Sequence, residues 1–157
     1  MIDGGSTTQL VAESLKAKRK LMVLTNSAAV AFTLLGINDN IVMMTGGEMK
    51  VETGVMIGPT AIQTISQHRA DRAILGMSSV LCSEGFFTVN PYEAELKRKM
   101  MQLSSDVTVV VDSSKFGRKS FSFVCDFVGV NRVVTDSDID KETLSKLEEN
   151  GVEVIVG

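Results

Sequence analysis

Short runs of consecutive apolar residues alternate with longer amphipathic stretches along the whole chain. A run that is apolar at every position, rather than at every second one, is typical of a strand buried on both faces of a parallel sheet. Six such strands are predicted, at residues 20–25, 41–44, 72–76, 107–112, 132–135 and 152–156. One further short strand or extended segment is predicted at residues 121–125.

The stretches between these runs predict helices at residues 7–18, 27–35, 59–67, 91–103 and 140–150. Local signals support several of the boundaries. Asn26 is a suitable cap for the second helix, and Pro59 and Pro91 stand where a first helical turn tolerates proline. Gly151 is a suitable stop after the last helix. Regular alternation of strands and helices predicts an α/β fold.

Composition narrows the class of protein. A chain of 157 residues fits one domain with a core of its own. With 16 basic and 19 acidic residues the net charge is −3, so the chain lacks the basic field that holds nucleic acid. Two cysteines without a Cys-x-x-Cys spacing, one histidine and no long apolar run predict a cytoplasmic protein with no metal, cofactor or membrane segment.

The start of the chain predicts a fragment. Residues 1–3 have the character of a strand end that runs straight into a glycine-rich turn. We expect that a natural N-terminal portion is absent, and a short strand is the alternative.

The strongest candidate for chemistry is the segment from Asp3 to Thr8, Asp-Gly-Gly-Ser-Thr-Thr, between the presumed strand and the first helix. Glycines let a ligand approach the backbone, and the hydroxyls and free N–H groups of a helix start can hold an anion such as phosphate. The segment matches neither the P-loop nor the dinucleotide-binding glycine pattern. The alternative is a tight turn with a Ser or Thr cap.

Other polar residues follow predicted strands, at Thr25-Asn26, Thr45 to Glu48 and Gly76 to Ser79. Ligands of open α/β sheets bind at the carboxyl ends of strands, so one shared cleft is predicted there.

Two pairs of charged residues are further candidates. Glu93 and Lys97 are four residues apart on a predicted helix, where Lys97 could meet a phosphate or a carbonyl and Glu93 could orient it. A solvated ion pair is the alternative. Asp112 and Lys115 follow the most apolar strand and could bind sugar hydroxyls and phosphate, with a plain Asx turn as the alternative.

Taken in order, these segments resemble the C-terminal effector domain of DeoR-family bacterial transcriptional regulators. The resemblance covers nearly the whole chain. It is carried by Asp3-Gly-Gly-Ser-Thr-Thr8, Leu24-Thr-Asn26, Thr45-Gly-Gly47, Arg72-Ala-Ile-Leu-Gly76, Glu93-Ala-Glu-Leu-Lys-Arg98, Val111-Asp-Ser-Ser-Lys-Phe-Gly-Arg118 and Val133-Val-Thr-Asp136.

The resemblance implies a Rossmann-like three-layer α/β/α sandwich of the phosphosugar isomerase and CoA-transferase superfamily. Residues 1–157 would form one effector-binding domain, without the N-terminal winged helix-turn-helix that binds operator DNA. The domain would bind a phosphorylated sugar, modulate operator binding and form a dimer or tetramer. The implied ligand-binding residues are Asp3, Gly5, Ser6, Thr7, Thr8, Asn26, Gly47, Glu93, Lys97, Asp112 and Lys115.

Two other functions are compatible with the same resemblance. One is a sugar-phosphate isomerase or deaminase, since Glu93 and Lys97 could serve as base and cation. Such enzymes usually carry a second acidic cluster in mid-chain, and residues 76–80 contain none. The other is an oligomerisation domain without ligand binding, against which the Gly-Ser-Thr-Thr loop argues. The sequence therefore favours a sensor that is not an enzyme.

Overall fold

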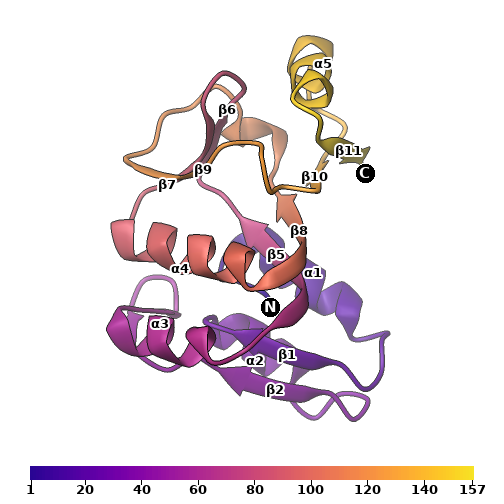
Figure 1. The fold of residues 1–157 in the computed structure, drawn as a ribbon. Coiled ribbons are helices and arrows are strands. Elements are labelled where there is room, and N and C mark those ends of the chain that lie inside the picture. The colour runs from indigo at the N-terminus through magenta and orange to yellow at the C-terminus, as the bar shows by residue number, and fades with distance from the viewer.

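A mostly parallel sheet with helices on both faces organises the computed structural model, which describes residues 1–157 (Figure 1). Four strands form one half in the order β11-β10-β8-β5, and two strands form the other in the order β2-β1, with every neighbouring pair parallel. The strands are β1 (Met22–Thr25), β2 (Ile41–Met44), β5 (Ala70–Gly76), β8 (Ser104–Val110), β10 (Arg132–Thr135) and β11 (Glu153–Val156). The predicted α/β fold is confirmed.

Residues 1–3 join the two halves of the sheet. Ile2 forms parallel bridges to Thr25 of β1 and to Ile74 of β5. Its N–H donates to Leu24 O at 3.0 Å, and the Met1 carbonyl accepts from Ile74 N at 3.0 Å. The turn that follows, from Gly4 onward, therefore leaves from the centre of the sheet.

Helices cover the two faces of the sheet in separate groups. The helices α1 (Ser6–Leu15) and α2 (Ala28–Leu34) enclose a small core with Ile2 and Val23. On the other face, α3 (Pro59–Ser66), α4 (Pro91–Gln102) and α5 (Lys141–Glu149) enclose the larger core. No helix is long and apolar enough to cross a membrane.

Several helix boundaries differ from the prediction for local reasons. The cap of α2 is Ser27 and not Asn26, because the Ser27 hydroxyl accepts from Val30 N at 3.3 Å. The α1 helix ends at Leu15, and the basic residues that follow lie outside it. Pro91 starts α4 as predicted. The preceding residue, Asn90, is the helix cap, and its side chain accepts hydrogen bonds from the backbone N–H groups of Tyr92 and Glu93.

Two small antiparallel pieces complete the fold, and most of them were not predicted. The hairpin of β3 (Glu48–Lys50) and β4 (Val55–Ile57) follows β2. A three-stranded sheet in the order β6-β7-β9 contains β6 (Ser79–Leu81), β7 (Gly85–Thr88) and β9 (Ser122–Cys125). Only β9 corresponds to a predicted segment.

Gly85 allows β7 to approach β9 closely. Its φ is +118°, and a Cβ there would lie 2.2 Å from the Cys125 carbonyl oxygen and 2.8 Å from Asp126 Cα. Because backbone atoms cannot move aside as a side chain can, we expect Gly85→Ala to lower the free energy of unfolding by about 1–3 kcal/mol. Chemical denaturation checks this, with Gly129→Ala as a control that has the same sign of φ but open space. Equal losses in the two variants would contradict the packing explanation.

Candidate functional site

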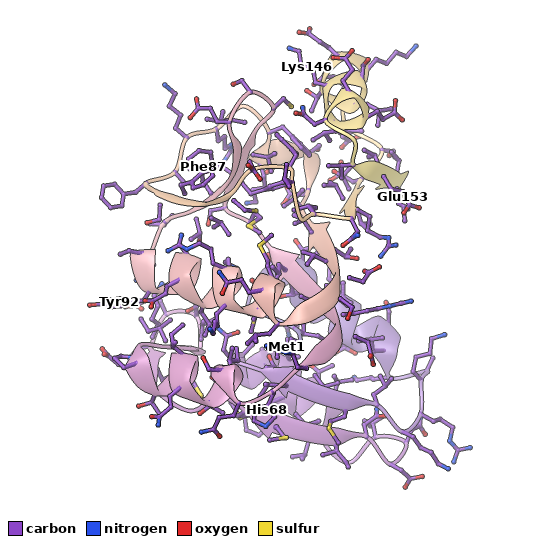
Figure 2. All side chains as sticks on the ribbon, in the orientation of Figure 1. Met1, His68, Phe87, Tyr92, Lys146 and Glu153 are labelled. Carbon is purple, nitrogen blue, oxygen red and sulfur yellow. The ribbon has the colours of Figure 1, made fainter.

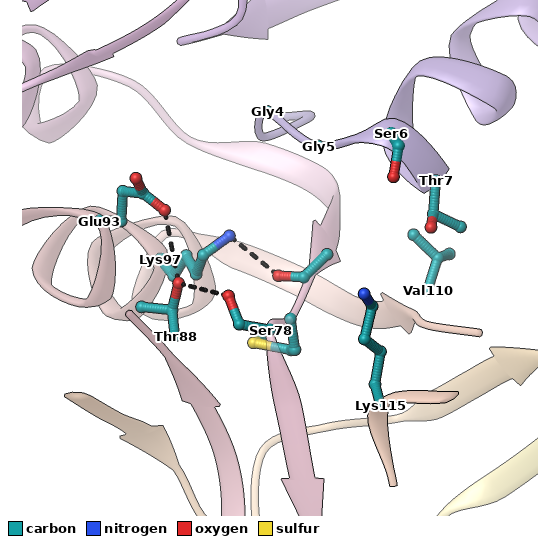
Figure 3. Close-up of a pocket in the computed structure, with 12 residues that line it drawn as sticks. Gly4, Gly5, Ser6, Thr7, Ser78, Thr88, Glu93, Lys97, Val110 and Lys115 are labelled. Atoms are coloured by element: carbon teal, nitrogen blue, oxygen red, sulfur yellow. Dashed lines mark hydrogen bonds between the residues drawn. The ribbon is translucent and has the colours of Figure 1, made fainter. Parts of the chain in front are cut away.

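A cavity of about 210 Å³ opens at the carboxyl ends of the central strands (Figure 3). The loop after Asp3, the end of β5, the first half of α4 and the short 3-10 helix η1 (Ser113–Lys115) surround it. Its lining residues are Gly4, Gly5, Ser6, Thr7, Gly76, Met77, Ser78, Thr88, Glu93, Lys97, Val110 and Lys115. Two of the twelve are hydrophobic, so the wall is mainly polar.

The N-terminus of α1 faces this cavity without a side-chain cap. Gly5 is the cap residue, its backbone is extended, and no acidic residue stands in the first turn. The first bond that closes the helix runs from Gln9 N to Gly5 O at 3.0 Å, so the N–H groups of residues 6–8 have no acceptor within the helix. Free N–H groups and the positive end of a helix dipole are suited to hold an anion.

The Lys97 side chain extends from α4 to the centre of the sheet. Its side chain is 7% exposed and forms an ion pair with the buried Asp3 carboxylate. Its ammonium also donates to Gly76 O at 2.9 Å, while Asp3 Oδ1 accepts from Gly76 N at 2.9 Å. Burial raises the pKa of Asp3, and the Lys97 ammonium opposes that rise. The pair thus ties the central segment, β5 and α4 together at the floor of the cavity.

Glu93 does not orient Lys97, so that interpretation of the pair is wrong. Glu93 Oε1 instead accepts a hydrogen bond at 2.6 Å from Nζ of Lys50, which belongs to the β3–β4 hairpin. Its other oxygen accepts from the Thr88 hydroxyl at 3.4 Å, and that hydroxyl lies 3.2 Å from the Ser78 hydroxyl (Figure 3). Ser78, Thr88 and Glu93 form one connected polar wall.

Lys115 faces the cavity from η1, on the side opposite Lys97 (Figure 3). Its ammonium lies 3.8 Å from Asp112 Oδ2, and both side chains are partly exposed. Asp112 Oδ1 accepts from Ser114 N at 3.0 Å, which is the Asx turn considered as the alternative. Hydrogen bonds from Ser114, followed by the charge of Lys115, lower the pKa of Asp112. Asp112 therefore caps η1 and lines an adjoining groove instead of this cavity.

The sequence model of the DeoR C-terminal sensor domain matches residues 1–137. The chain belongs to this family. The predicted resemblance is thereby confirmed, and the arrangement above is the cavity of a DeoR sensor domain.

Curated relatives of this DeoR sensor domain are transcriptional regulators. The chain is 31% identical over 156 residues to a putative aga operon transcriptional repressor of Escherichia coli O157:H7. The matched region covers 99% of the chain and 58% of that repressor. It is 32% identical over 155 residues to the HTH-type transcriptional regulator GlpR of Haloferax volcanii, covering 99% and 60%. It is 31% identical over 153 residues to the glycerol-3-phosphate regulon repressor of Escherichia coli K12, covering 98% and 61%.

The chain spans about three fifths of the length of these relatives. The matching family model describes a sensor domain, and these relatives carry the names of transcriptional regulators.

The DeoR sensor domain brings six of the predicted ligand-binding residues to the cavity, which are Gly5, Ser6, Thr7, Glu93, Lys97 and Lys115. Asp3 lies beneath it as the partner of Lys97. Thr8 is buried and its hydroxyl donates to Gly5 O at 3.0 Å.

Asn26 and Gly47 do not line this cavity. The buried Asn26 amide donates to Met56 O at 3.1 Å. Gly47 has a φ of +109°, and a Cβ there would lie 2.5 Å from the Ile57 carbonyl oxygen. Its small size serves the close packing of the hairpin. Next to the end of β1, Ser27 lines an adjoining pocket, which shares Gly4, Gly5, Ser6 and Glu93 with the cavity.

Two polar residues of the site were not predicted. Thr88 contributes its hydroxyl to the polar wall, and Lys50 neutralises Glu93 from the hairpin. No pattern in the sequence marks Thr88. Lys50 is 43 residues from its partner, and only a prediction of the hairpin would have brought it near.

Proposed function

We propose that this DeoR sensor domain binds a phosphorylated sugar or a related small phosphometabolite in the cavity at the start of α1. We further propose that binding changes the affinity of a DNA-binding segment of the longer protein for its operator. The observation that carries the proposal is the uncapped N-terminus of α1, which opens into the same cavity as two lysines.

The charges support a phosphate at the start of α1. The free N–H groups of residues 6–8 lie at the N-terminal end of α1, and Ser6 and Thr7 line the cavity there with their hydroxyl-bearing side chains. Lys115 supplies an ammonium from across the cavity, since its link to Asp112 is long at 3.8 Å. Charge-assisted hydrogen bonds of this kind are the strong ones in phosphate recognition.

The remaining wall supports a polyol attached to that phosphate. Ser78, Thr88 and Glu93 offer donors and acceptors in a row, which suits the hydroxyl groups of a sugar. A volume of about 210 Å³ favours a small metabolite. One relative is named a glycerol-3-phosphate regulon repressor, whose name contains a phosphorylated small polyol.

The position of the cavity supports a role in switching. Its floor is the contact where Lys97 joins Asp3 and Gly76, so three elements meet beneath the ligand. A ligand that prefers one arrangement of these elements shifts the population toward it, and this differential affinity is the source of regulation.

A thermal-shift panel of phosphorylated sugars, each beside its unphosphorylated counterpart, tests the proposal. A ligand at 100 times its Kd adds about 2.7 kcal/mol of stability. We expect a clear shift with at least one phosphorylated sugar and none with its free sugar. The compound that shifts is then incubated with the protein and analysed for product. Turnover would contradict the sensor function, and an equal shift with the free sugar would contradict phosphate recognition.

Lys115 is the residue whose replacement tests phosphate binding without loss of the fold. Lys115→Gln removes the ammonium from a partly exposed side chain, and we expect the affinity for the phosphorylated ligand to fall about 10–100-fold. Isothermal titration calorimetry measures the change. Lys119→Gln, in the exposed loop that follows, is the matched control and should bind as the parent does. Unchanged affinity in Lys115→Gln would remove this lysine from the site.

A further inference from the structure

The strand β2 is the outermost strand of the main sheet and has no neighbour beyond it (Figure 1). Ile41 N donates to Leu21 O at 2.8 Å, and Thr45 N donates to Thr25 O at 3.0 Å. Successive residues of a strand direct their peptide groups to opposite sides. The N–H and C=O groups of Val42 and Met44 therefore face the open edge, where β1 cannot reach them.

This edge is short, at four residues, but otherwise lacks the features that usually keep strand edges apart. Its four residues are Ile, Val, Met and Met, with no charge and no proline, and their pairing with β1 is in regular register. Exposed edges are normally blocked by charges, prolines or bulges. At the opposite edge, β11 carries the exposed Glu153 (Figure 2). Its carboxylate forms an ion pair with Arg132 at 3.3 Å. The edge at β2 therefore carries no charge, whereas the edge at β11 carries one.

Exposed apolar side chains surround the same edge. Ile41 is 54% exposed, and Met22, its register partner on β1, is 70% exposed. The α2 helix packs against β2 and carries Phe32, which is 77% exposed, and the exposed Leu35 follows directly after it. Exposed apolar side chains near an unpaired strand edge favour coverage by another protein.

We propose that a second copy of this chain covers the edge, by antiparallel pairing of β2 with β2 about a two-fold axis at Met43. In this register Val42 lies opposite Met44 of the partner subunit, and the peptide N–H of each donates to the carbonyl of the other. The two-fold axis creates the same pair of hydrogen bonds between Met44 and Val42 of the partner subunit. The outward-facing groups are thus satisfied without a shift of either strand. The strand is uncharged, so a second β2 meets no like charge when it pairs. The inference is independent of the proposed effector site.

Sedimentation velocity of the chain over a dilution series tests the assembly. The parent protein is expected to sediment as a dimer that dissociates on dilution. Met44→Pro removes one outward N–H that β1 does not use, and Ile41→Lys places a charge on the edge, so both variants should sediment as monomers. Val128→Lys changes an apolar residue that is 83% exposed on a distant loop and should leave the dimer intact. Circular dichroism confirms that each variant is folded. A parent that is monomeric at every concentration, or variants that stay dimeric, would overturn the proposal.

A cysteine at the axis tests the register itself. Residues that face each other between the hydrogen-bonded pairs have Cα atoms about 4.5 Å apart, which a disulfide can span. Met43→Cys should therefore form a reducible covalent dimer on mild oxidation. The parent protein, whose Cys82 and Cys125 are free, and Val128→Cys should form none. Cross-linking at position 128 but not at 43 would place the interface elsewhere.

Discussion

Replacing Lys97 by methionine should lower the free energy of unfolding by about 3–5 kcal/mol. Methionine keeps the length and the apolar stem of lysine, but it leaves the Asp3 carboxylate 1% exposed and without its cation. An uncompensated buried charge is among the most destabilising changes that a single substitution makes. Urea denaturation followed by circular dichroism measures the loss. Lys99→Met, two residues along the same helix and outside any ion pair, should cost far less.

A double variant separates the ion pair from packing. Asp3→Asn in the Lys97→Met background removes the buried charge that the single variant leaves behind. We expect the double variant to recover most of the lost stability, because replacing both partners is far less costly than removing one. A double variant as unstable as Lys97→Met alone would show that the loss comes from packing around the stem.

The instability of Lys97→Met should also depend on pH. Burial raises the pKa of Asp3, and Lys97 is the main opposing influence. Without Lys97, the folded state holds the Asp3 proton to a higher pH than the unfolded state does. The folded form then binds more protons, so its stability falls as the pH rises from about 4 toward the folded pKa. The deficit relative to the parent should be smaller at pH 4 than at pH 7.

The buried ion pair with Asp3 changes how Lys97 can be used to probe ligand binding. The sequence places Lys97 on the ligand side of a helix, from which a simple loss of affinity would be expected in an alanine variant. The structure shows that Lys97 first holds the carboxylate beneath the cavity. A loss of binding in a Lys97 variant is therefore informative only beside its stability.

The main sheet could be predicted from the sequence because its strands are apolar on both faces. The predicted strands at 41–44 and 132–135 match β2 and β10 residue for residue. Helix starts were predictable where a local signal exists, as at Pro91. The first helix was predicted too long because the basic residues after Leu15 continue a helical pattern that the structure does not follow.

The missing elements have weak local signals. The strands β3 and β4 contain three residues each, too few to show a period. At the site, the loop from Gly4 to Thr7 was predictable because its chemistry lies in consecutive residues. The partners of Glu93 and Lys97 were not, because Lys50 and Asp3 are 43 and 94 residues away and depend on the tertiary fold. The spacing of four residues along the helix favoured a pair between Glu93 and Lys97, which the structure lacks.

Replacing Gly5 by aspartate should weaken binding of the phosphorylated ligand at least about 100-fold while leaving the domain as stable as before or more so. Gly5 has a φ of 169°, an extended backbone that any residue adopts, and a Cβ there would meet only the Thr8 hydroxyl at 3.5 Å. Aspartate is a favoured helix cap, and its charge suits the positive end of α1.

The same carboxylate would occupy the N–H groups that the proposed phosphate needs and would repel the phosphate. Two like charges 4 Å apart at a protein surface interact unfavourably by about 4 kcal/mol, which is enough for the expected loss. Calorimetric titration with the compound identified by thermal shift measures the affinity, and thermal unfolding measures the stability.

Two control variants at Gly5 separate charge from shape. Gly5→Ala should leave the N–H groups free and retain binding, and Gly5→Asn should compete for them without repulsion and lose less affinity than aspartate. Opposite signs of the effects on stability and affinity distinguish a ligand site from a structural turn, because damage to a turn lowers both. Full binding by Gly5→Asp would mean that the phosphate is not held at the start of α1. Lys115 and the polar wall of Ser78, Thr88 and Glu93 would then have to hold the ligand.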